Sequence, residues 1–232
     1  MTPGEWEPET ARWIRWVRTP GHDAYCRFRD AFFDDLLPPP DRRTLEVGCG
    51  EGRVARDLAA RGHRVTAVDT ALGLVRQARE DGGGAFALAG GEALPFPTGA
   101  FDLAVAYNAL QVVADMPATV AEIARVLGPG GRLAACVAHP VTDLGRFAGE
   151  GTPPAFVLRE RYFENERVEE TVEDAGLTMT FRGWTYSLED YGRALEAAGL
   201  CIVALREPRP GGGDRFRAWR RVPLFLSFLA AR

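Results

Sequence analysis

Hydrophobic residues recur with two different periods along the chain. Short runs of apolar and β-branched residues, which are typical of buried strands, occupy residues 44–47, 63–68, 85–89, 103–107 and 132–138. Segments with apolar side chains three or four positions apart, which are typical of amphipathic helices, occupy residues 54–59, 72–80 and 120–127. Strands and helices that alternate in this way predict an α/β fold built on a mostly parallel sheet.

Two further amphipathic segments precede the first strand. Residues 5–18 carry tryptophans at positions 6, 13 and 16, and residues 22–37 carry aromatic side chains roughly on one side. We expect two helices here, the second ended by the prolines at positions 38–40. Their aromatic faces favour packing against the sheet, because large apolar side chains are mostly buried in folded proteins.

The chain departs from this alternation after residue 139. Residues 140–187 form a connection far longer than usual, in which residues 156–162, 168–173 and 177–184 alternate like strands, with a hairpin turn at 174–176. We therefore expect an insertion with its own small sheet. A helix over residues 188–198 follows, and the strands over 200–205 and 222–230 predict an antiparallel hairpin at the sheet edge because no helix separates them.

Composition indicates one compact domain in a reducing compartment. The chain has 232 residues, a net charge of −4 and 26% charged residues, so its charge gives no case for a nucleic-acid or membrane partner. Its four cysteines lie far apart, which argues against a disulfide framework or a zinc site, and we expect no metal. Because no apolar run could span a bilayer and no signal-peptide core begins the chain, we expect a cytoplasmic protein.

Three glycines at every second position, Gly48, Gly50 and Gly52, follow the first strand. Glycine adopts backbone angles that other residues avoid and lets a ligand approach the backbone, so this turn can hold a nucleotide-like group. The dinucleotide-binding pattern Gly-x-Gly-x-x-Gly places its third glycine one residue later, where this chain has Arg53. The pattern Glu46-x-Gly-x-Gly-x-Gly instead resembles the first motif of the class I S-adenosylmethionine (SAM)-dependent methyltransferases.

An acidic residue at the end of the second strand fits the same interpretation. Asp69 lies 21 positions after Gly48, close to the roughly 20 residues at which a carboxylate reaches a ribose hydroxyl in such units. A carboxylate can accept hydrogen bonds from both hydroxyls of a ribose. Asp69 could also cap the helix over residues 72–80, and the two roles are compatible.

The most specific local resemblance to small-molecule members of this family lies in residues 90–103. Residues 90–96 read Gly-Gly-Glu-Ala-Leu-Pro-Phe, and residues 101–103 read Phe-Asp-Leu. The resemblance implies that the first segment lies along the adenine, where an aspartate usually receives the exocyclic amine. This chain has Gly90 at the matching place, so adenine would be held by backbone groups of residues 91–93 or by Glu92 pointing inward.

Tyr107 and Asn108 stand at the end of the fourth strand. Open parallel sheets bind ligands at the carboxyl ends of their strands, so both residues should face the cofactor or the acceptor. Many members of the resembled family carry a histidine a few residues later, where this chain has Gln-Val-Val at 111–113. The Pro-Gly-Gly sequence at 129–131, before the fifth strand, resembles the family again.

Taken together, the resemblance implies a fold and a cofactor. The fold is a seven-stranded, mostly parallel Rossmann-like sheet with an antiparallel C-terminal hairpin, an N-terminal helical lid and a β-rich insertion after strand five. The implied division is a helical cap over residues 1–40, a SAM-binding core over 41–138, a substrate-covering insertion over 139–186 and the end of the core sheet over 187–232. The residues implied to bind SAM are Glu46, Gly48, Cys49, Gly50, Arg53, Asp69, Thr70, Gly91, Glu92, Ala93, Asn108 and Ala109.

The lid and the insertion also provide candidates for substrate contact. These are Trp13, His22, Tyr25, Tyr107, Tyr162, Trp184 and Tyr186, of which the last three could equally form the core of the insertion. His139 follows strand five at the mouth of the expected site, and the ordinary pKa of histidine, near neutrality, suits a general base. The alternative for His139 is a loop histidine bonded to a backbone carbonyl.

The expected function is methyl transfer from SAM to an oxygen, nitrogen or carbon atom of a small metabolite, by a monomer or a homodimer. A methyltransferase for RNA or protein is the second possibility. The arginines at positions 215, 217, 220 and 221 could bind an anion, although a solvated loop is favoured in an acidic chain. The third possibility is a non-catalytic regulatory module that binds SAM or another nucleotide.

Overall fold

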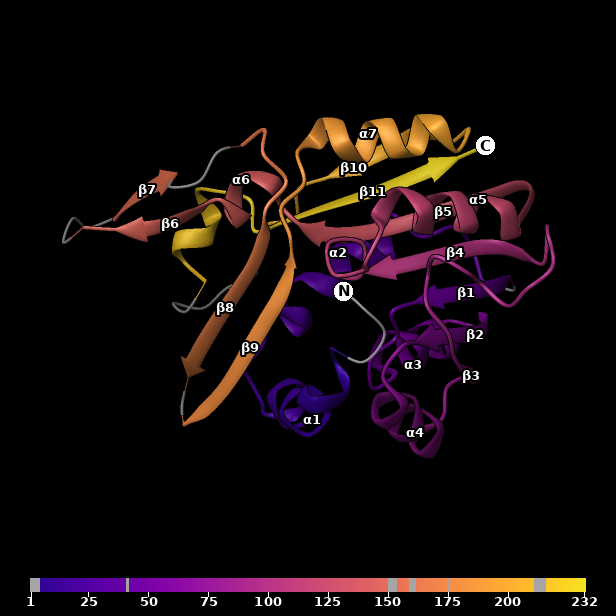
Figure 1. Ribbon diagram of the computed structural model, residues 1–232, viewed down its shortest axis with the longest axis horizontal. Helices are drawn as coiled ribbons and strands as arrows, with labels where there is room; N and C mark the ends of the chain where they lie inside the picture. The colour runs from indigo at the N-terminus through magenta and orange to yellow at the C-terminus, as the bar shows by residue number, and fades with distance from the viewer. Residues whose placement is uncertain (1–4, 41, 150–153, 159–161, 175, 211–215) are drawn as a thin grey trace.

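The centre of the molecule is a seven-stranded sheet with the order β10-β11-β5-β4-β1-β2-β3 (Figure 1). The computed structural model describes residues 5–40, 42–149, 154–158, 162–174, 176–210 and 216–232. The strands of the sheet are β1 (Arg43–Val47), β2 (Arg64–Asp69), β3 (Ala85–Leu88), β4 (Phe101–Tyr107), β5 (Leu127–Ala138), β10 (Cys201–Arg206) and β11 (Phe225–Ala231). The first five pair in parallel, and β11 pairs antiparallel with both β5 and β10. The predicted fold class is confirmed.

The two central strands, β1 and β4, are buried on both faces. Leu45 of β1 pairs with Ala104 of β4, and neither is exposed to solvent. A sheet covered on both faces favours continuous apolar runs, and β4 has one over residues 103–107, whereas β1 places the buried polar residues Thr44 and Glu46 between its apolar ones. The chain order reverses between β1 and β4, and open α/β sheets bind ligands beyond the carboxyl ends of the strands at this point.

Helices cover both faces of the sheet. The helices α2 (Tyr25–Asp35), α3 (Arg53–Ala60) and α4 (Leu72–Asp81) share a core with one face, and α5 (Met116–Val126) and α7 (Leu188–Ala197) share a core with the other. The shorter helices are η1 (Glu7–Glu9), α1 (Thr10–Arg18), α6 (Pro140–Asp143) and η2 (Ala218–Arg220). None of the helices in the described ranges is long and apolar enough to cross a membrane.

Two elements begin earlier than the hydrophobic pattern predicts. α5 begins at Met116 because Asp115 caps it: its Oδ1 accepts a hydrogen bond from the backbone N–H of Ala118 at 2.9 Å. β5 begins at Leu127, which pairs with Phe101 of β4, so the glycine-rich segment before residue 132 belongs to the strand. A polar cap and a backbone pairing do not depend on apolar periodicity, which is why the pattern missed both.

The insertion contains two separate two-stranded ribbons, so the prediction of one small sheet is wrong. β6 (Gly145–Ala148) pairs with β7 (Ala155–Leu158), and β8 (Arg167–Asp174) pairs with β9 (Leu177–Trp184) over their full lengths. The two ribbons have different partners. Phe147 and Phe156 of the first pack around Trp219, and β9 of the second lies along α1 (Figure 1). Parts of the expected segments, residues 159–161 and Ala175, lie outside the described residues.

The cysteines are free thiols, as expected, and Cys49 and Cys136 are buried. Within the part of the chain that the structure describes, no group of three or more histidine, cysteine or acidic side chains could hold a metal ion.

An ion pair joins the starts of β1 and β4, and it should make stability depend on pH. Hydrogen bonds from the Arg43 guanidinium to Asp102, one of them 2.7 Å long, lower the pKa of Asp102 to about 2. Because the pKa is lower in the folded state than the roughly 3.9 of an unfolded chain, the stabilisation is present above about pH 4 and is lost as the pH falls towards 2.

We expect Asp102→Asn to lower Tm slightly at neutral pH. The difference from wild type should shrink between about pH 4 and 2 in calorimetric scans, and a constant difference would contradict this origin.

Candidate functional site

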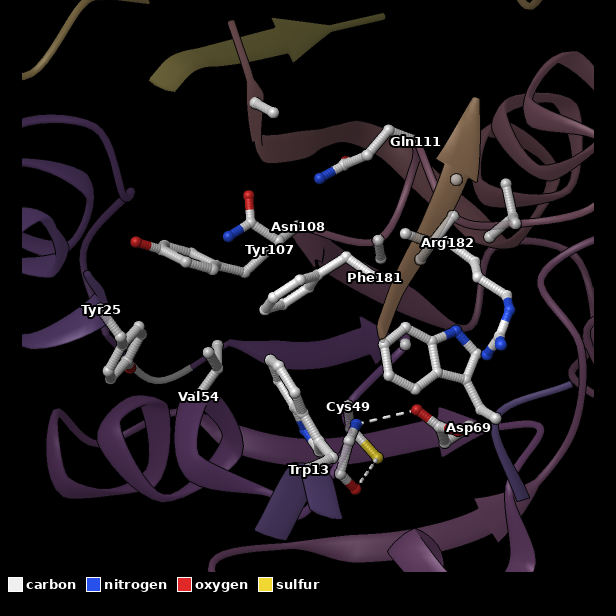
Figure 2. Close-up of a pocket in the computed structure, with 18 of the residues that line it drawn as sticks. Trp13, Tyr25, Cys49, Val54, Asp69, Tyr107, Asn108, Gln111, Phe181 and Arg182 are labelled. Atoms are coloured by element: carbon white, nitrogen blue, oxygen red, sulfur yellow. Dashed lines mark hydrogen bonds between the residues drawn. The ribbon is translucent and has the colours of Figure 1, made fainter. Parts of the chain in front are cut away.

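A cavity of about 650 Å³ lies at the carboxyl ends of β1 and β4. The turn between β1 and α3 forms one side, the loop after β4 forms another, and side chains of α1 and β9 lie across them (Figure 2). This is the end of the sheet at which its topology predicts a ligand. The cavity therefore defines the candidate site.

The turn between β1 and α3 is built on glycines in the left-handed region. Gly48, Gly50 and Gly52 have φ values of +73°, +55° and +87°. A Cβ added to Gly48 would lie 2.7 Å from the Cβ of Ala109, and one added to Gly50 would lie 3.2 Å from Nε1 of Trp13. The turn is thus closely covered on two sides, and its three glycines present backbone where other residues would carry a side chain.

Asp69, at the end of β2, holds this turn in place. Its Oδ2 accepts a hydrogen bond from the backbone N–H of Gly50 at 2.8 Å, and its Oδ1 accepts one from that of Ala71 at 2.9 Å. Burial raises the pKa of Asp69, and the backbone N–H groups oppose that rise. Asp69 is not the N-cap residue of α4, as the sequence allowed. That position is occupied by Ala71, and Asp69 accepts a hydrogen bond from its backbone N–H.

Glu46 places a buried carboxyl group in β1 beside the cavity. The residue is 1% exposed, and its Oε2 makes no hydrogen bond. Burial, and after it the charge of Asp69, raise the pKa of Glu46 well above its ordinary value. A buried carboxyl oxygen without a partner costs free energy, so this site favours a ligand that brings a cation or an N–H donor.

Arg53, the first residue of α3, joins the N-terminal helices to the turn. Its guanidinium pairs with Asp23 and lies 4.4 Å from the ring centre of Tyr25 and 5.4 Å from that of Trp13. The Tyr25 hydroxyl donates a hydrogen bond to Asp57 at 2.6 Å, and burial together with this carboxylate raises the pKa of Tyr25. The charge of Arg53 is therefore neutralised by Asp23, and its guanidinium packs between the rings of Trp13 and Tyr25, which line the cavity.

The side chain of Glu92 lies beside Gly90, in the space that a side chain at position 90 would occupy. Its Oε1 accepts hydrogen bonds from the backbone N–H groups of Ala114, at 2.9 Å, and Asp115, at 3.3 Å. A Cβ added to Gly90 would lie 2.8 Å from the Oε2 of Glu92. The carboxylate of Glu92 thus occupies the space that a side chain at position 90 would use, and it lines the cavity.

The cavity is covered by α1 and β9. Phe181 of β9 packs edge-on against Trp13 and Trp16 of α1, with ring centres 6.4 and 5.6 Å apart. Figure 2 shows Trp13 and Phe181 side by side above the glycine turn. Glu9 pairs with Arg182 of β9 at 3.3 Å, and the carboxylate of Glu7 accepts from the N–H of Gly73 at the start of α4. These contacts fix α1 to both the second ribbon and the core.

The loop after β4 contains an unusual backbone conformation. Among the described residues, Asn108 alone has a positive φ, +53°, without being a glycine, and its N–H donates to the carbonyl of Cys136 at 2.7 Å. Asparagine tolerates this region better than most residues, and such conformations concentrate at functional sites. Three buried atoms here, Oδ1 of Asn108, Oε1 of Gln111 and Nε1 of Trp184, make no hydrogen bond.

The structure brings most of the residues singled out from the sequence to this one cavity. Those that line it are Trp13, His22, Tyr25, Glu46, Gly48, Cys49, Gly50, Arg53, Asp69, Thr70, Gly91, Glu92, Tyr107, Asn108, Ala109 and Trp184. Ala93, His139, Tyr162 and Tyr186 are not among the lining residues.

His139 is held away from the cavity by two interactions of its ring. Its Nδ1 accepts a hydrogen bond from the N–H of Val141 and so caps α6, while its Nε2 lies 3.0 Å from the Oε1 of Glu207. Burial lowers the pKa of His139, and the Glu207 carboxylate opposes that change. Neither the predicted base role nor the alternative, a bond to a backbone carbonyl, describes this arrangement. The side chain is a helix cap paired with an acid.

The other three lie outside the cavity lining. The hydroxyl of Tyr162 accepts a hydrogen bond from the N–H of Leu188 at the start of α7. Tyr186 packs on Tyr191 of α7, with ring centres 5.7 Å apart. Ala93 is exposed. The two tyrosines contact α7, whereas the alternative left open for them was the core of the insertion itself.

Several lining residues were not selected from the sequence. They include Trp16, Gln111, Val168, Val172, Phe181, Phe216, Trp219 and Phe225. The alternation over residues 177–184 does place Phe181 on one face of a strand, which is a usable signal. The hydrophobic pattern does not show that the face of β9 with Phe181 packs on Trp13 and Trp16 of α1, because these residues are more than 160 positions apart in the chain.

Comparisons with known proteins point to one chemistry. Residues 45–135 match the family model described as a methyltransferase domain. A demethylmenaquinone methyltransferase from Parafrankia sp. is 36% identical and is matched over 81% of this chain and 85% of its own length. A malonyl-[acyl-carrier protein] O-methyltransferase from Serratia marcescens is 39% identical over 93 residues, but this chain spans only about a third of its length.

A solved structure supports the same fold. A SAM-dependent methyltransferase from Mesorhizobium loti has a TM-score of 0.71 to this chain at 22% identity, covering 87% of this chain and 96% of that one. At this identity the likeness concerns the fold alone. Residues 45–47 of β1, the glycine turn and all of β4 lie in the segment that the family model matches.

Proposed function

Since this chain belongs to the class I SAM-dependent methyltransferases, we propose that it transfers a methyl group from SAM to an oxygen, nitrogen or carbon atom of a small metabolite. The observation that carries the proposal is one cavity with two unlike halves. One half is bounded by the glycine turn, Asp69 and Glu46, and the other by aromatic side chains of α1 and β9. A transferase needs room for a cofactor and an acceptor side by side.

The chemistry of the first half fits SAM. A backbone turn that side chains would obstruct provides a cradle at Gly48 and Gly50, and the unpartnered oxygen of Glu46 suits the ammonium of the methionine part. Asp69 would accept hydrogen bonds from the ribose hydroxyls. Cys49, Thr70, Asn108 and Ala109 complete the walls of this half. Arg53 is paired with Asp23, so we propose that it positions Trp13 and Tyr25 and leaves the carboxylate of the cofactor to other donors.

The chain's own contribution to catalysis is mainly orientation. SAM supplies a methyl group already activated by the positive charge of its sulfur. Holding an acceptor atom in line with that bond can supply several kcal/mol by orientation alone. Trp13, Trp16 and Phe181 would shield bound ligands from water, and His139 takes no part in this proposal because its ring nitrogens contact Val141 and Glu207.

The proposal is tested by calorimetric titration with SAM, S-adenosylhomocysteine and NAD, followed by transfer of labelled methyl groups to small-molecule extracts. Binding of the two sulfur compounds and labelling of a small product are the expected results. Binding of NAD alone would overturn the proposal. Full SAM affinity with no transfer to any fraction would indicate a regulatory module, and labelling of RNA or protein would indicate the other class of acceptor.

We propose further that Glu92 receives the exocyclic amine of adenine in place of an aspartate at position 90. The Ala114 and Asp115 N–H groups hold one oxygen of Glu92, and none of the side-chain hydrogen bonds between described residues uses the other, which would accept from the amine. We expect Glu92→Gln to weaken S-adenosylhomocysteine binding by about tenfold or more, because a hydrogen bond to a charged group contributes about 1.5–3 kcal/mol.

The control for this prediction is S-inosylhomocysteine, in which a carbonyl replaces the amine. Wild-type protein should prefer the amine, and Glu92→Gln should lose or reverse that preference because its amide can donate to the carbonyl. Equal preference in both proteins, measured by calorimetry, would show that Glu92 does not recognise this group.

A further inference from the structure

The indole nitrogen of Trp13 lies directly against the glycine turn. A Cβ added to Gly50 would lie 3.2 Å from this Nε1, which is the one atom of a described residue, beyond the two chain neighbours, within 4 Å of that position. Figure 2 shows Trp13 beside Cys49 of the same turn, whereas Asn108 and Gln111 lie farther from it. Because an indole N–H can donate but not accept, a ligand held on this turn would meet a donor at this point.

This N–H is both unused and accessible. None of the hydrogen bonds between described residues involves Nε1 of Trp13, and the half-buried side chain lines the cavity. The Nε1 of Trp184, by contrast, has almost no accessible surface. A ligand in the cavity can therefore bond to the Trp13 donor where it stands.

Three neighbours fix the position of the Trp13 ring. The Arg53 guanidinium lies 5.4 Å from its centre, and Trp6 and Phe181 pack against it edge-on, with ring centres 5.7 and 6.4 Å away. A donor that is already held in place loses little conformational entropy when a ligand binds. The side chain is thus a preorganised neutral donor above the turn.

The arginines of the cavity are already engaged. Among the described residues, only Arg53 and Arg182 line it as permanent cations, and Arg53 pairs with Asp23 while Arg182 pairs with Glu9 and Glu169. A carboxylate that leaves water loses free energy unless hydrogen bonds replace its hydration. An anionic group on the turn would therefore depend on neutral N–H donors.

The amino-acid end of SAM carries an ammonium and a carboxylate on the same carbon atom. The buried, unpartnered oxygen of Glu46 suits the ammonium. The negative charges of Glu46 and Asp69 would repel the carboxylate, which would then turn away from the ends of β1 and β2 and towards the helix that covers the turn. Trp13 is the donor that stands there.

From these observations we infer that Trp13 binds the carboxylate of the cofactor through its indole N–H, and that α1 thereby recognises the amino-acid end of the cofactor. The inference rests on the proposed function, since it concerns the same ligand. It assigns a donor to the one charged group of the cofactor that the proposed function leaves without a partner.

The test compares two ligands by calorimetric titration. One is S-adenosylhomocysteine, and the other is its decarboxylated analogue, which keeps the amine, the sulfur and the adenosine. We expect wild-type protein to bind S-adenosylhomocysteine at least about tenfold more tightly, because hydrogen bonds to charged groups are stronger than those between neutral groups. Equal affinity of wild-type protein for the two ligands would overturn the inference.

Two tryptophan variants separate the N–H from the packing of the helix. Trp13→Phe keeps an aromatic ring and removes the N–H, so it should weaken S-adenosylhomocysteine about tenfold, leave the analogue unchanged and lose the preference. Trp16→Phe makes the same change on the same helix and should keep the wild-type preference. If Trp13→Phe weakens both ligands equally, or weakens neither, Trp13 only covers the turn and the inference is wrong.

A second change at the same position allows for a Trp13→Phe protein that is too unstable to titrate. Benzothienylalanine at position 13 replaces the N–H by sulfur in a ring of nearly the same shape. This protein should keep the Tm of wild type and lose the preference for S-adenosylhomocysteine. A preference that survives this replacement would overturn the inference.

Failure of this inference is distinguishable from failure of the proposed function. If S-adenosylhomocysteine binds and its preference over the analogue does not depend on the Trp13 N–H, only the assignment of Trp13 is wrong. If S-adenosylhomocysteine does not bind, the proposed function fails and this inference fails with it.

Discussion

Asp69→Ala should lower the affinity for S-adenosylhomocysteine by about 100-fold or more. The carboxylate would accept two hydrogen bonds from the ribose, and hydrogen bonds to charged groups contribute about 1.5–3 kcal/mol each. The same carboxylate accepts from the N–H groups of Gly50 and Ala71, so its removal also releases the glycine turn that forms the cradle. Both effects weaken the same complex, which makes this the largest expected loss of affinity from one side chain.

Calorimetric titration measures this effect, with two further variants for comparison. Asp69→Asn keeps an oxygen for one backbone N–H and should lose less affinity than Asp69→Ala. Asp102→Asn makes the same change at a carboxylate outside the cavity lining and should bind S-adenosylhomocysteine as wild type does. If Asp69→Ala and Asp102→Asn bind equally well, Asp69 does not hold the ribose.

Gly48→Ala should destabilise the folded protein by several kcal/mol. The residue has a φ of +73°, where an alanine costs about 1–2 kcal/mol, and its new Cβ would lie 2.7 Å from the Cβ of Ala109. Neither methyl group can rotate away, so the backbone must move, and overpacking of this kind costs about 1–3 kcal/mol more. For a domain of this size we expect Tm to fall by roughly 10 °C, measured by thermal unfolding.

The structure offers two controls that separate strain from overlap. Gly199 has a φ of +71° and open space where a Cβ would be, so Gly199→Ala should show the cost of the backbone conformation alone. The double variant Gly48→Ala with Ala109→Gly lacks the methyl group that the new Cβ would meet. Its Tm should therefore rise from that of Gly48→Ala to about the Tm of Gly199→Ala. If Gly199→Ala is as damaging as Gly48→Ala, the close approach to Ala109 contributes nothing.

The part of the cavity that we propose for the cofactor was predictable from the sequence because its elements are local. A strand, a glycine turn and a helix follow one another within residues 43–60, and Asp69 ends the next strand. Each of these signals depends on a backbone requirement, such as the positive φ of Gly48, that few residue types can meet. The same locality explains why α3, α4 and β4 begin within two residues of where the pattern places them.

The acceptor half was only partly predictable because it is assembled from distant segments. Trp13 and Trp184 were expected near a substrate from the resemblance alone, and Trp16 and Phe181 were missed because their contact joins α1 to β9. For His139, the place after β5 suggested a base, but the sequence did not indicate that its ring caps α6 and lies against Glu207.

The insertion was misjudged for a related reason. Alternating residues predict strands, but they do not say which strands pair. β8 pairs with β9, and β6 pairs with β7, so each ribbon is complete without the other. The first ribbon packs on Trp219, which lies more than 60 residues away in the chain, and a packing partner that distant leaves no periodic signal.

The manner in which α1 is attached has a kinetic consequence. α1 and the η1 turn before it are fastened by side-chain contacts of Glu7 and Glu9 of η1 and by packing of Trp13 and Trp16 on Phe181, and they contribute no strand to the sheet. Lifting α1 would uncover the glycine turn while the core stays folded, and local openings of this kind cost far less than global unfolding. We therefore expect exchange of the cofactor to need the movement of this one short helix and not the opening of the sheet.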